Sequence, residues 1–319
     1  MIGDYALVVG EALIDVVMRG GRTLGEHVGG SPLNVAVGLA RLGRPVDFLT
    51  WIGDDERGRR IAEHLRASGA RLVDGSIEAS RTATALATLD ATGSASYLFD
   101  IEWRLSPRAI AAPYAPLVVH TGSIATVLEP GCADVTAIIE SCSANATITF
   151  DPNVRPPLID DPNAARSRVE EMVARADVVK ASDEDLRWLE PGMPEDEVAA
   201  RWVASGPAIV AVTRGSQGAF AVCAAGQQRV PAHTVDVVDT VGAGDAFMAG
   251  LIDALWDRGL LGADRRNALH AITSDTLADV LELAALSSAL TVARPGADLP
   301  DRATRDRALG AAPRLQPGR

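Results

Sequence analysis

The chain has 319 residues, of which 47% are hydrophobic, so it can bury a large core as one α/β domain or as a domain with a smaller appendage. Its net charge of −12 leaves no basic stripe for a phosphate backbone, which argues against nucleic acid as a partner. It also lacks the roughly 20 unbroken apolar residues that span a bilayer and the basic start of an export signal, so we expect a cytoplasmic protein with no membrane partner.

Short apolar runs alternate with segments of helical period, which predicts a mainly parallel sheet covered by helices on both faces. The candidate strands are 5–10, 45–50, 115–121, 146–151, 176–181 and 208–213. Candidate helices include 31–43, 242–259 and 276–292. The polar residues 301–319 predict a frayed C-terminal tail, and we expect the whole of 1–319 to form a single domain.

Two stretches break the alternation of strand and helix. Residues 11–21 continue the first strand, and residues 82–100 have the pattern of two strands joined at 91–93. Small strands inserted in the loops of an α/β sheet commonly cover the site at the strand ends. The pattern therefore predicts a β-strand lid built from about 11–28 and 82–103, and the alternative is an edge hairpin without a role.

Glycines surround a helix start in the motif DTVGAGDAF. Gly242, Ala243 and Gly244 would turn successive N–H groups outward at the positive end of the helix, which makes an anion hole. Asp245 follows in the first turn, where a base could take a proton from a hydroxyl group that attacks the bound phosphorus. Alternatively, Asp245 is a first-turn acid that favours the helix dipole.

The chain contains a single lysine, Lys180, among its 30 basic residues. It has no GK[ST] phosphate loop and no protein-kinase motif set, and Schiff-base chemistry would have to use Lys180. Any phosphate chemistry must therefore rely on backbone amides, arginines and a metal ion.

Long motifs at both ends of the chain resemble those of one family. DTVGAGDAFMAG resembles the C-terminal signature of the PfkB sugar kinases, the ribokinase-like superfamily, and VGGSPLNVAVGLARLGRPVDFLTWIGDDERG resembles their N-terminal signature. Further similar segments follow in the right order: GEALIDVV, HTGSIA, FDPNVRP, VKASDEDL, VTRGSQGA and ARPGA. The resemblance implies a three-layer α/β/α ribokinase-like fold with a mostly parallel central sheet and a small β-strand lid.

Kinases of this family transfer the γ-phosphoryl group of ATP to a primary hydroxyl of a sugar, with Mg²⁺ bridging the phosphates. The resemblance makes Asp245 the general base, and the amides of Gly242, Ala243 and Gly244 the donors that hold the transferring group.

Five residues match substrate positions of the family or lie close to them. Asp15, Gly29, Gly30 and Asn34 correspond to sugar-binding positions, for which the structural alternatives are a strand-end acid, turn glycines and a helix-start asparagine. Arg155 follows a strand end and could grip phosphate or a substrate carboxylate.

The segment VTRGSQGA resembles the nucleotide loop of the family. Thr213, Gly215 and Gly218 would shape a turn against ATP, and the same residues also fit a tight hairpin between strands 208–213 and 219–222. Lys180 could reach a phosphate or merely end a strand.

Two further acids match metal positions. Asp185 stands where relatives carry a residue that orders magnesium-bound water, although it could equally belong to an acidic helix start. Asp239 and the carbonyl of Val241 match a monovalent-cation site, such as one for K⁺, described for part of the superfamily. From the loop alone, Asp239 could also cap backbone amides.

The motifs look most like the fructokinase branch, which makes fructose the expected sugar. The alternatives are a 2-keto-3-deoxygluconate kinase, for which Arg104 is a candidate cation facing the substrate carboxylate, and a ribokinase-type kinase. A non-catalytic sugar- or nucleotide-binding regulator on the same fold is an alternative of a different class. Lids in this family often pair subunits, so a homodimer through the lid is a further expectation.

Overall fold

The central sheet is the frame of the protein, seen in a computed structural model that describes residues 3–89 and 95–311. Nine strands of the described residues form this sheet. Their order is β15 (Gly226–Val230), β14 (Ala219–Cys223), β13 (Ile209–Thr213), β12 (Val178–Ser182), β11 (Thr147–Asp151), β10 (Val118–Gly122), β1 (Ala6–Val9), β4 (Val46–Leu49) and β6 (Arg71–Leu72). The strands from β13 to β6 pair in parallel, and β14 and β15 pair antiparallel at one edge. A mostly parallel sheet is confirmed.

The predicted strands read as unbroken apolar runs because both of their faces are covered. In β1, for example, all four side chains are fully buried. Ala6 and Val8 point into one hydrophobic cluster, and Leu7 and Val9 point into the other. The two clusters are the two faces of the sheet, so the core has two layers.

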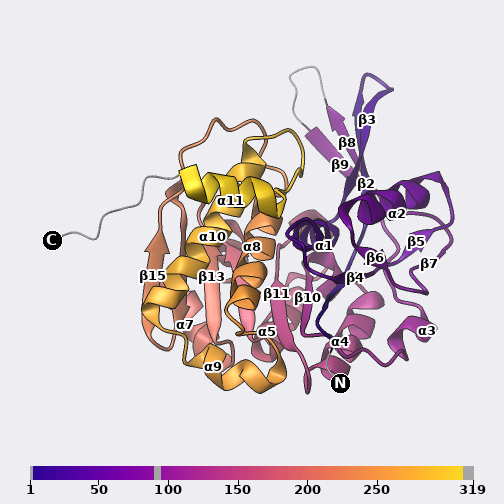
Figure 1. The fold of residues 1–319 in the computed structure, drawn as a ribbon. Helices are drawn as coiled ribbons and strands as arrows, with labels where there is room; N and C mark the ends of the chain where they lie inside the picture. Colours follow the sequence, from indigo (N-terminus) through magenta and orange to yellow (C-terminus); the bar gives the residue numbers. More distant parts are fainter. Residues whose placement is uncertain (1–2, 90–94, 312–319) are drawn as a thin grey trace.

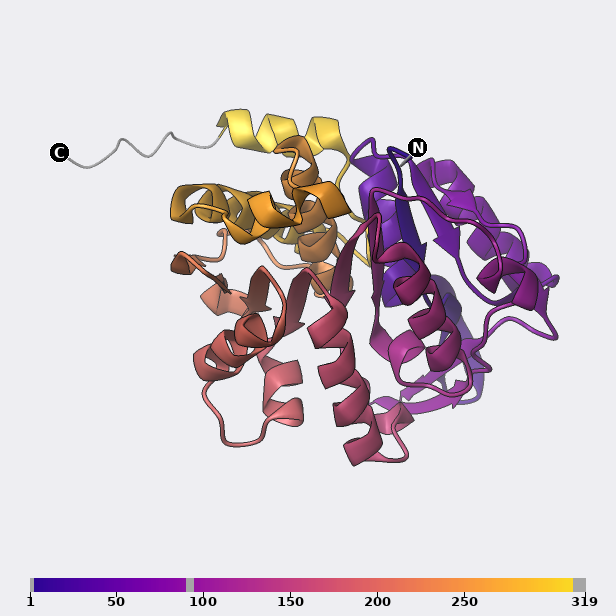
Figure 2. The same ribbon diagram turned by 90° about the horizontal axis from the view of Figure 1, so that it is seen from below.

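Helices cover both faces of the sheet (Figures 1 and 2). The first cluster is covered by α1 (Ser31–Arg41), α2 (Glu56–Ser68), α8 (Ala243–Asp257), α9 (Arg266–His270) and α10 (Ser274–Val292). The second is covered by α3 (Pro107–Ile110), α4 (Gly131–Cys142), α5 (Pro162–Arg175), α6 (Asp183–Leu189) and α7 (Glu195–Ser205). Short 3₁₀ turns are η1 (Ser123–Thr126), η2 (Pro156–Leu158), η3 (Gly215–Gln217) and η4 (Ala263–Arg265).

A second sheet projects from one end of the molecule (Figure 1). It has the order β3 (Arg22–Gly29), β2 (Leu13–Arg19), β8 (Thr84–Leu89) and β9 (Ala95–Asp100), and a separate pair joins β5 (Ile52–Gly53) and β7 (Ile77–Ala79). The strands predicted in the two lid segments are therefore present, while the predicted turn at 91–93 lies outside the described residues. That this sheet works as a lid stays a prediction.

The sheet of β3, β2, β8 and β9, which we call the lid sheet, is joined to α2 by ion pairs. On β3, the Glu26 carboxylate accepts hydrogen bonds from Arg57 Nη2 at 2.5 Å and from Arg60 Nη1 at 2.6 Å. A carboxylate held by two guanidinium groups has a defined orientation. These contacts fix β3 beside α2.

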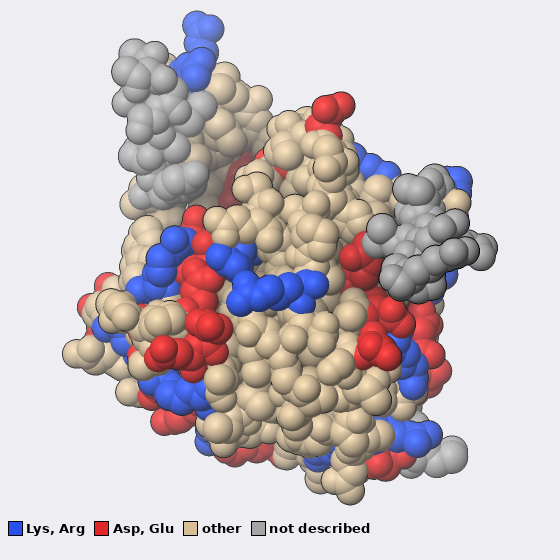
Figure 3. Space-filling model, turned by 90° about the vertical axis from the view of Figure 1, so that its left-hand side faces the viewer, with Lys and Arg blue, Asp and Glu red and all other residues tan. Residues whose placement is uncertain are grey.

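The surface charge and the helix lengths bear on possible partners. On the face shown in Figure 3, groups of basic and acidic side chains are interspersed with uncharged surface. No helix among the described residues is long and apolar enough to cross a membrane. The expectations of no nucleic-acid partner and of a cytoplasmic location stay predictions.

The prediction of a frayed polar tail is wrong for residues 302–311, which form helix α11 (Arg302–Ala311). Asp253 of α8 is fully buried and accepts hydrogen bonds from Arg44 Nε at 2.5 Å and Arg302 Nη2 at 2.6 Å. The buried Arg305 also pairs with this carboxylate. Arginines that look solvated in the sequence thus hold α11 against α8, and residues 312–319 lie outside the described part.

Replacing Asp253 by Asn should destabilise the protein strongly, because the buried Arg305 would lose its buried carboxylate partner, whereas Arg44 and Arg302 would keep Asp257. We expect a loss of about 3 to 5 kcal/mol in the free energy of unfolding, measured by urea denaturation. Asp279→Asn is the control, since the Asp279–Arg258 pair is exposed and should contribute less than about 1 kcal/mol. Equal effects of the two substitutions would contradict a structural role for the Asp253 cluster.

Candidate active site

The candidate site lies where the parallel strands end. Asp151 closes β11, Ser182 closes β12 and Thr213 closes β13, so these residues share the carboxyl edge of the sheet. Ligands of open α/β sheets bind at this edge. Helix α8 begins beside it, because a Cβ atom built on Gly244 would stand 2.9 Å from Nζ of Lys180 in β12.

The loop before α8 depends on its glycine and on Asp239. Gly242 has φ of 77°, and a Cβ atom there would stand 2.7 Å from the Cβ of Ala297. Asp239 accepts hydrogen bonds from the backbone N–H of Val241 at 3.0 Å and of Gly296 at 2.9 Å. These bonds hold the pKa of Asp239 below its ordinary value. Asp239 therefore caps backbone amides, and a cation site at Asp239 and Val241 stays a prediction.

The amides at the start of α8 differ in their availability. The N–H of Ala243 donates to the carbonyl of Thr240 at 3.3 Å. Within the described residues, the N–H groups of Gly242 and Gly244 have no hydrogen-bond acceptor. Together with the positive end of the helix dipole, these two open donors form a place for an anion. We call Gly242, Ala243 and Gly244 the amide hole.

The carboxylate of Asp245 is fixed by two donors from α1. Ser31 Oγ donates to Oδ1 and Asn34 Nδ2 donates to Oδ2, each at 2.7 Å. Asp245 is 7% exposed, and each of its oxygens keeps a lone pair for another donor. Sequence reasoning assigned Asn34 to the sugar and missed Ser31, because a serine at a helix start is an ordinary residue there. Asn34 bonds to Asp245 in this structure, and its contact with sugar stays a prediction.

Helices α1 and α8 approach closely enough for these bonds because of a glycine. A Cβ atom on Gly38 would stand 2.8 Å from the Cβ of Ala249. The contact joins the two long motifs, although Asn34 and Asp245 are 211 positions apart.

The predicted sugar positions also lie together. A Cβ atom on Gly29 would stand 2.1 Å from Oδ2 of Asp15, so glycine leaves room for that carboxylate. Gly30 has φ of 119°, and a Cβ atom there would stand 2.5 Å from the carbonyl oxygen of Glu11. Burial raises the pKa of Asp15, although His27 opposes this shift.

Glu11 is an acid near the site that sequence reasoning did not single out. Its side chain is 4% exposed, and burial raises its pKa to about 7, although a Ser123 hydrogen bond and the Arg155 charge oppose the shift. Its Oε2 atom has no hydrogen-bond partner among the described residues. A buried carboxyl of this kind makes stability depend on pH.

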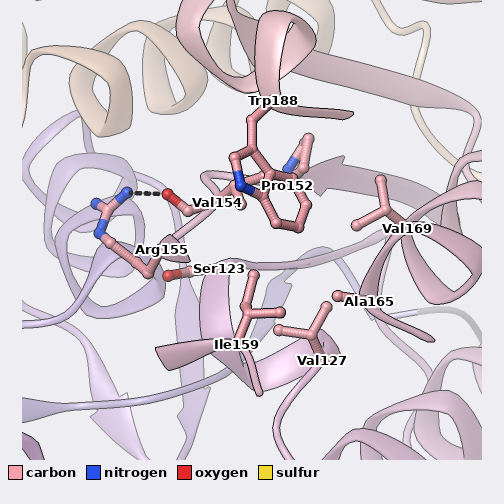
Figure 4. A pocket seen from close by; sticks show the side chains of 9 residues that line it. All are labelled: Ser123, Val127, Pro152, Val154, Arg155, Ile159, Ala165, Val169 and Trp188. Atoms are coloured by element: carbon pink, nitrogen blue, oxygen red, sulfur yellow. Dashed lines mark hydrogen bonds between the residues drawn. The ribbon is translucent and has the colours of Figure 1, made fainter. Parts of the chain in front are cut away.

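Arg155 lies at the rim of the strand ends rather than in a deep pocket. Its Nη1 donates to Oδ1 of Asn153 at 2.7 Å and to the carbonyl of Val154 at 3.1 Å, so Asn153 pins the loop. Figure 4 shows Arg155 at one end of a small apolar cavity, opposite Val169, with the ring of Trp188 across it. The cavity holds about 10 Å³, enough for one water molecule and too small for a sugar.

Lys180 forms a buried ion pair with Asp151. Its Nζ donates to Oδ2 of Asp151 at 2.7 Å, and the two side chains are 3% and 0% exposed. Burial raises the pKa of Asp151 to about 6, although the ammonium group opposes the shift. Burial alone would lower the pKa of Lys180, but nearby carboxylates, Asp151 first, raise it overall. The strand-end position of Asp151 was the available signal for this missed residue.

Asp185 belongs to the start of helix α6. Its Oδ2 accepts from the N–H and the hydroxyl of Ser182, and its Oδ1 accepts from the N–H of Val154 at 2.7 Å. The acidic helix start that the sequence offered as an alternative is present as a capping box. Because Oδ1 keeps one lone pair, the residue also fits a water bound to Mg²⁺.

The segment predicted to bind nucleotide forms the expected hairpin between β13 and β14. Gly215 and Gly218 have φ of 52° and 84°, and a Cβ atom on Gly218 would stand 2.1 Å from the carbonyl of Val230. Thr213 lies beside Ser182 in the sheet. The turn needs its glycines for local geometry, and its contact with ATP stays a prediction.

Comparison with known proteins agrees with this geometry. Residues 4–304 match the profile of the pfkB family carbohydrate kinases. A fructokinase of Rhizobium leguminosarum bv. trifolii is 36% identical over 259 residues, covering 78% of this chain and 79% of that protein. The chain therefore belongs to the pfkB family and is a carbohydrate kinase, which confirms the kinase interpretation over a non-catalytic regulator.

Solved structures share the fold. A fructokinase from Xylella fastidiosa with bound ATP superposes with a TM-score of 0.81 at 24% identity, covering 96% of this chain and 99% of that chain. A fructokinase from Vibrio cholerae O395 in a form with fructose, ADP and calcium ion has a TM-score of 0.78 at 26% identity, covering 95% and 98%. The ribokinase-like α/β fold is confirmed.

Glu11 should make folding weaker as pH rises. Its pKa is 4.5 in the reference state and about 7 when folded, so its contribution to stability is complete below about pH 4.5 and is lost as pH rises through about 7. Between about pH 5 and about pH 8 the wild type should lose about 2.5 kcal/mol more than Glu11→Gln in the free energy of unfolding, measured by urea denaturation. Replacement of the exposed Glu63 by Gln is the control. If the free energy of unfolding fell equally with pH in the wild type and in Glu11→Gln, the prediction would be contradicted.

Proposed function

We propose that this pfkB-family carbohydrate kinase transfers the γ-phosphoryl group of ATP to a primary hydroxyl group of fructose, with Asp245 as the general base. The observation that carries the assignment is the carboxylate of Asp245, buried and fixed by Ser31 and Asn34 beside the amide hole. The similar fructokinases support fructose as the acceptor and ATP as the donor.

The chemical step follows from this arrangement. Asp245 takes the proton of the sugar hydroxyl as its oxygen attacks the γ-phosphorus in line, and the bond from that phosphorus to the bridging oxygen of ADP breaks. Ser31 and Asn34 hold the carboxylate in place, so little reorganisation is needed. The open amides of Gly242 and Gly244, with the dipole of α8, stabilise the charge that develops on the transferring group.

The remaining predicted residues complete the proposal. Asp15, with Gly29 and Gly30 beside it, would bind sugar hydroxyls, and Thr213, Gly215 and Gly218 would bind the nucleotide. Mg²⁺ bound with ATP would neutralise part of the phosphate charge, and Oδ1 of Asp185 would bind one of the water molecules on the metal ion. A monovalent cation such as K⁺ beside Asp239 and Val241 is part of the same proposal.

The lid sheet would close over the sugar and pair two chains. Leu24 on β3 is 60% exposed and Leu98 on β9 is 67% exposed, so each edge strand of this sheet presents an apolar side chain. Buried apolar area between two such sheets would favour a homodimer.

Fructose fits the site better than a sugar acid does. A carboxylate substrate needs a free cation, yet Arg104 lies over the ring of Trp51 at 5.8 Å and 3.9 Å from Glu102. Arg155 is held by Asn153. Both candidate cations are thus already engaged.

Replacing Asp245 by Ala should cut turnover by about 10² to 10⁴, because no other group takes the hydroxyl proton. ATP affinity, measured by calorimetry, should change by less than about threefold, since a base acts on the sugar. Ser31→Ala should lower turnover less, because Asn34 still holds the carboxylate. An Asp245→Ala protein with wild-type turnover would refute the base assignment.

The sugar assignment is tested by coupled release of ADP with fructose, ribose, 2-keto-3-deoxygluconate, adenosine and fructose 1- or 6-phosphate. We expect kcat/KM to be highest for fructose. If 2-keto-3-deoxygluconate were preferred, and Arg104→Met lowered only that activity, the chain would belong to the sugar-acid kinases instead.

A further inference from the structure

The lone lysine of the chain lies behind the amide hole. Lys180 is 3% exposed, and Gly244 approaches it so closely that a Cβ atom there would stand 2.9 Å from Nζ and 3.8 Å from Cε. The ammonium group therefore lies under the first turn of α8. Asp151 Oδ2 accepts one of its three N–H donors.

This place is unfavourable for a cation unless something compensates it. The N-terminus of a helix carries partial positive charge, which repels an ammonium group. Three carboxylates raise the pKa of Lys180 against its burial, namely Asp151, Asp185 and Asp245. The site thus holds more negative than positive charge before any phosphate enters. A transferring phosphoryl group adds further negative charge at the amide hole.

The composition singles out the same residue. Among the 30 lysine and arginine residues of the chain, lysine occurs at this position alone. An ammonium group is a compact point charge, whereas a guanidinium group is broad and planar. The space between Gly244 and Asp151 suits the smaller cation.

We propose that Lys180 is a positioning residue for phosphoryl transfer, held by Asp151 so that its charge stands behind the amide hole. The proposal rests on the proposed function, because it assumes that a phosphoryl group occupies the hole. The ammonium group offsets part of the negative charge of the three carboxylates and so lowers the energy of the charged transferring group. It acts through the field at the hole and has no contact with the sugar.

The competing explanation is that Lys180 only neutralises Asp151. Lys180→Met alone cannot separate the two, because an unpaired buried carboxylate can prevent folding. The double variant Asp151→Asn/Lys180→Met removes both charges together. If the lysine only neutralises Asp151, this variant recovers wild-type kcat. If the proposal holds, it folds but its kcat falls by about 10², with KM for fructose changed less than about threefold.

Asp177 and Arg266 provide a matched control just before the same strand. Arg266 Nε donates to Asp177 Oδ1 at 2.7 Å, and Asp177 precedes β12. Asp177→Asn/Arg266→Met therefore removes a less buried ion pair at the opposite end of β12 from Ser182, and its kcat should stay at the wild-type value. Gly244→Ala is a second probe, since its methyl group displaces the ammonium while both charges remain. It should lower kcat as well.

A binding measurement separates this proposal from the choice of sugar. Calorimetry with ADP, Mg²⁺ and aluminium fluoride mimics the transferring group without any sugar. The double variant should bind ADP alone like the wild type but bind the fluoride complex at least about tenfold more weakly. If the double variant lost affinity for the fluoride complex while the wild type had no activity on fructose, the assignment of fructose would be refuted and the role of Lys180 would be supported. Wild-type fluoride affinity in the folded double variant would overturn the proposal.

Discussion

The hydrogen bonds from Ser31 and Asn34 to Asp245 are the contacts on which the rest of the site depends. They bind both oxygens of one carboxylate, and they exist because Gly38 lets α1 approach α8. At its other end, α8 is held by the arginines around Asp253. The helix is therefore fixed at both ends, and its first turn lies beside Lys180 of β12. Such preorganisation is what electrostatic catalysis requires.

Negative charge is the main electrostatic difficulty of this site. Burial raises the pKa of Glu11 and Asp151, and Asp185 and Asp245 are buried nearby. A triphosphate can bind among these acids only if positive charge is supplied at short range. We propose that the chain does so with helix N–H groups, one buried ammonium group and a metal ion that enters with the nucleotide. In this proposal, the single lysine and the two open amides act together on the same phosphoryl group.

The sequence predicted the elements whose pattern is local. Strands such as Ala6–Val9 are continuous apolar runs because both faces are covered, and the glycines of the loop before α8 mark the start of that helix. Prediction from the sequence failed for residues whose surroundings are set by tertiary contacts. The sequence around Arg302 and Arg305 is typical of a solvated tail, but both residues pair with the buried Asp253. Ser31 is an ordinary residue for a helix start, but it donates a hydrogen bond to Asp245 of α8. The surroundings of Lys180 could not be predicted, because its position in a strand does not show which helix packs against it.

The cluster around Asp253 also has a consequence for synthesis. The ribosome makes Asp253 about fifty residues before Arg302 and Arg305, so of its three arginine partners only Arg44 exists when α8 is made. A product ending before α11 would have to bury that acid with Arg44 alone, at a substantial desolvation cost. The packing of α8 is thereby coupled to the synthesis of α11.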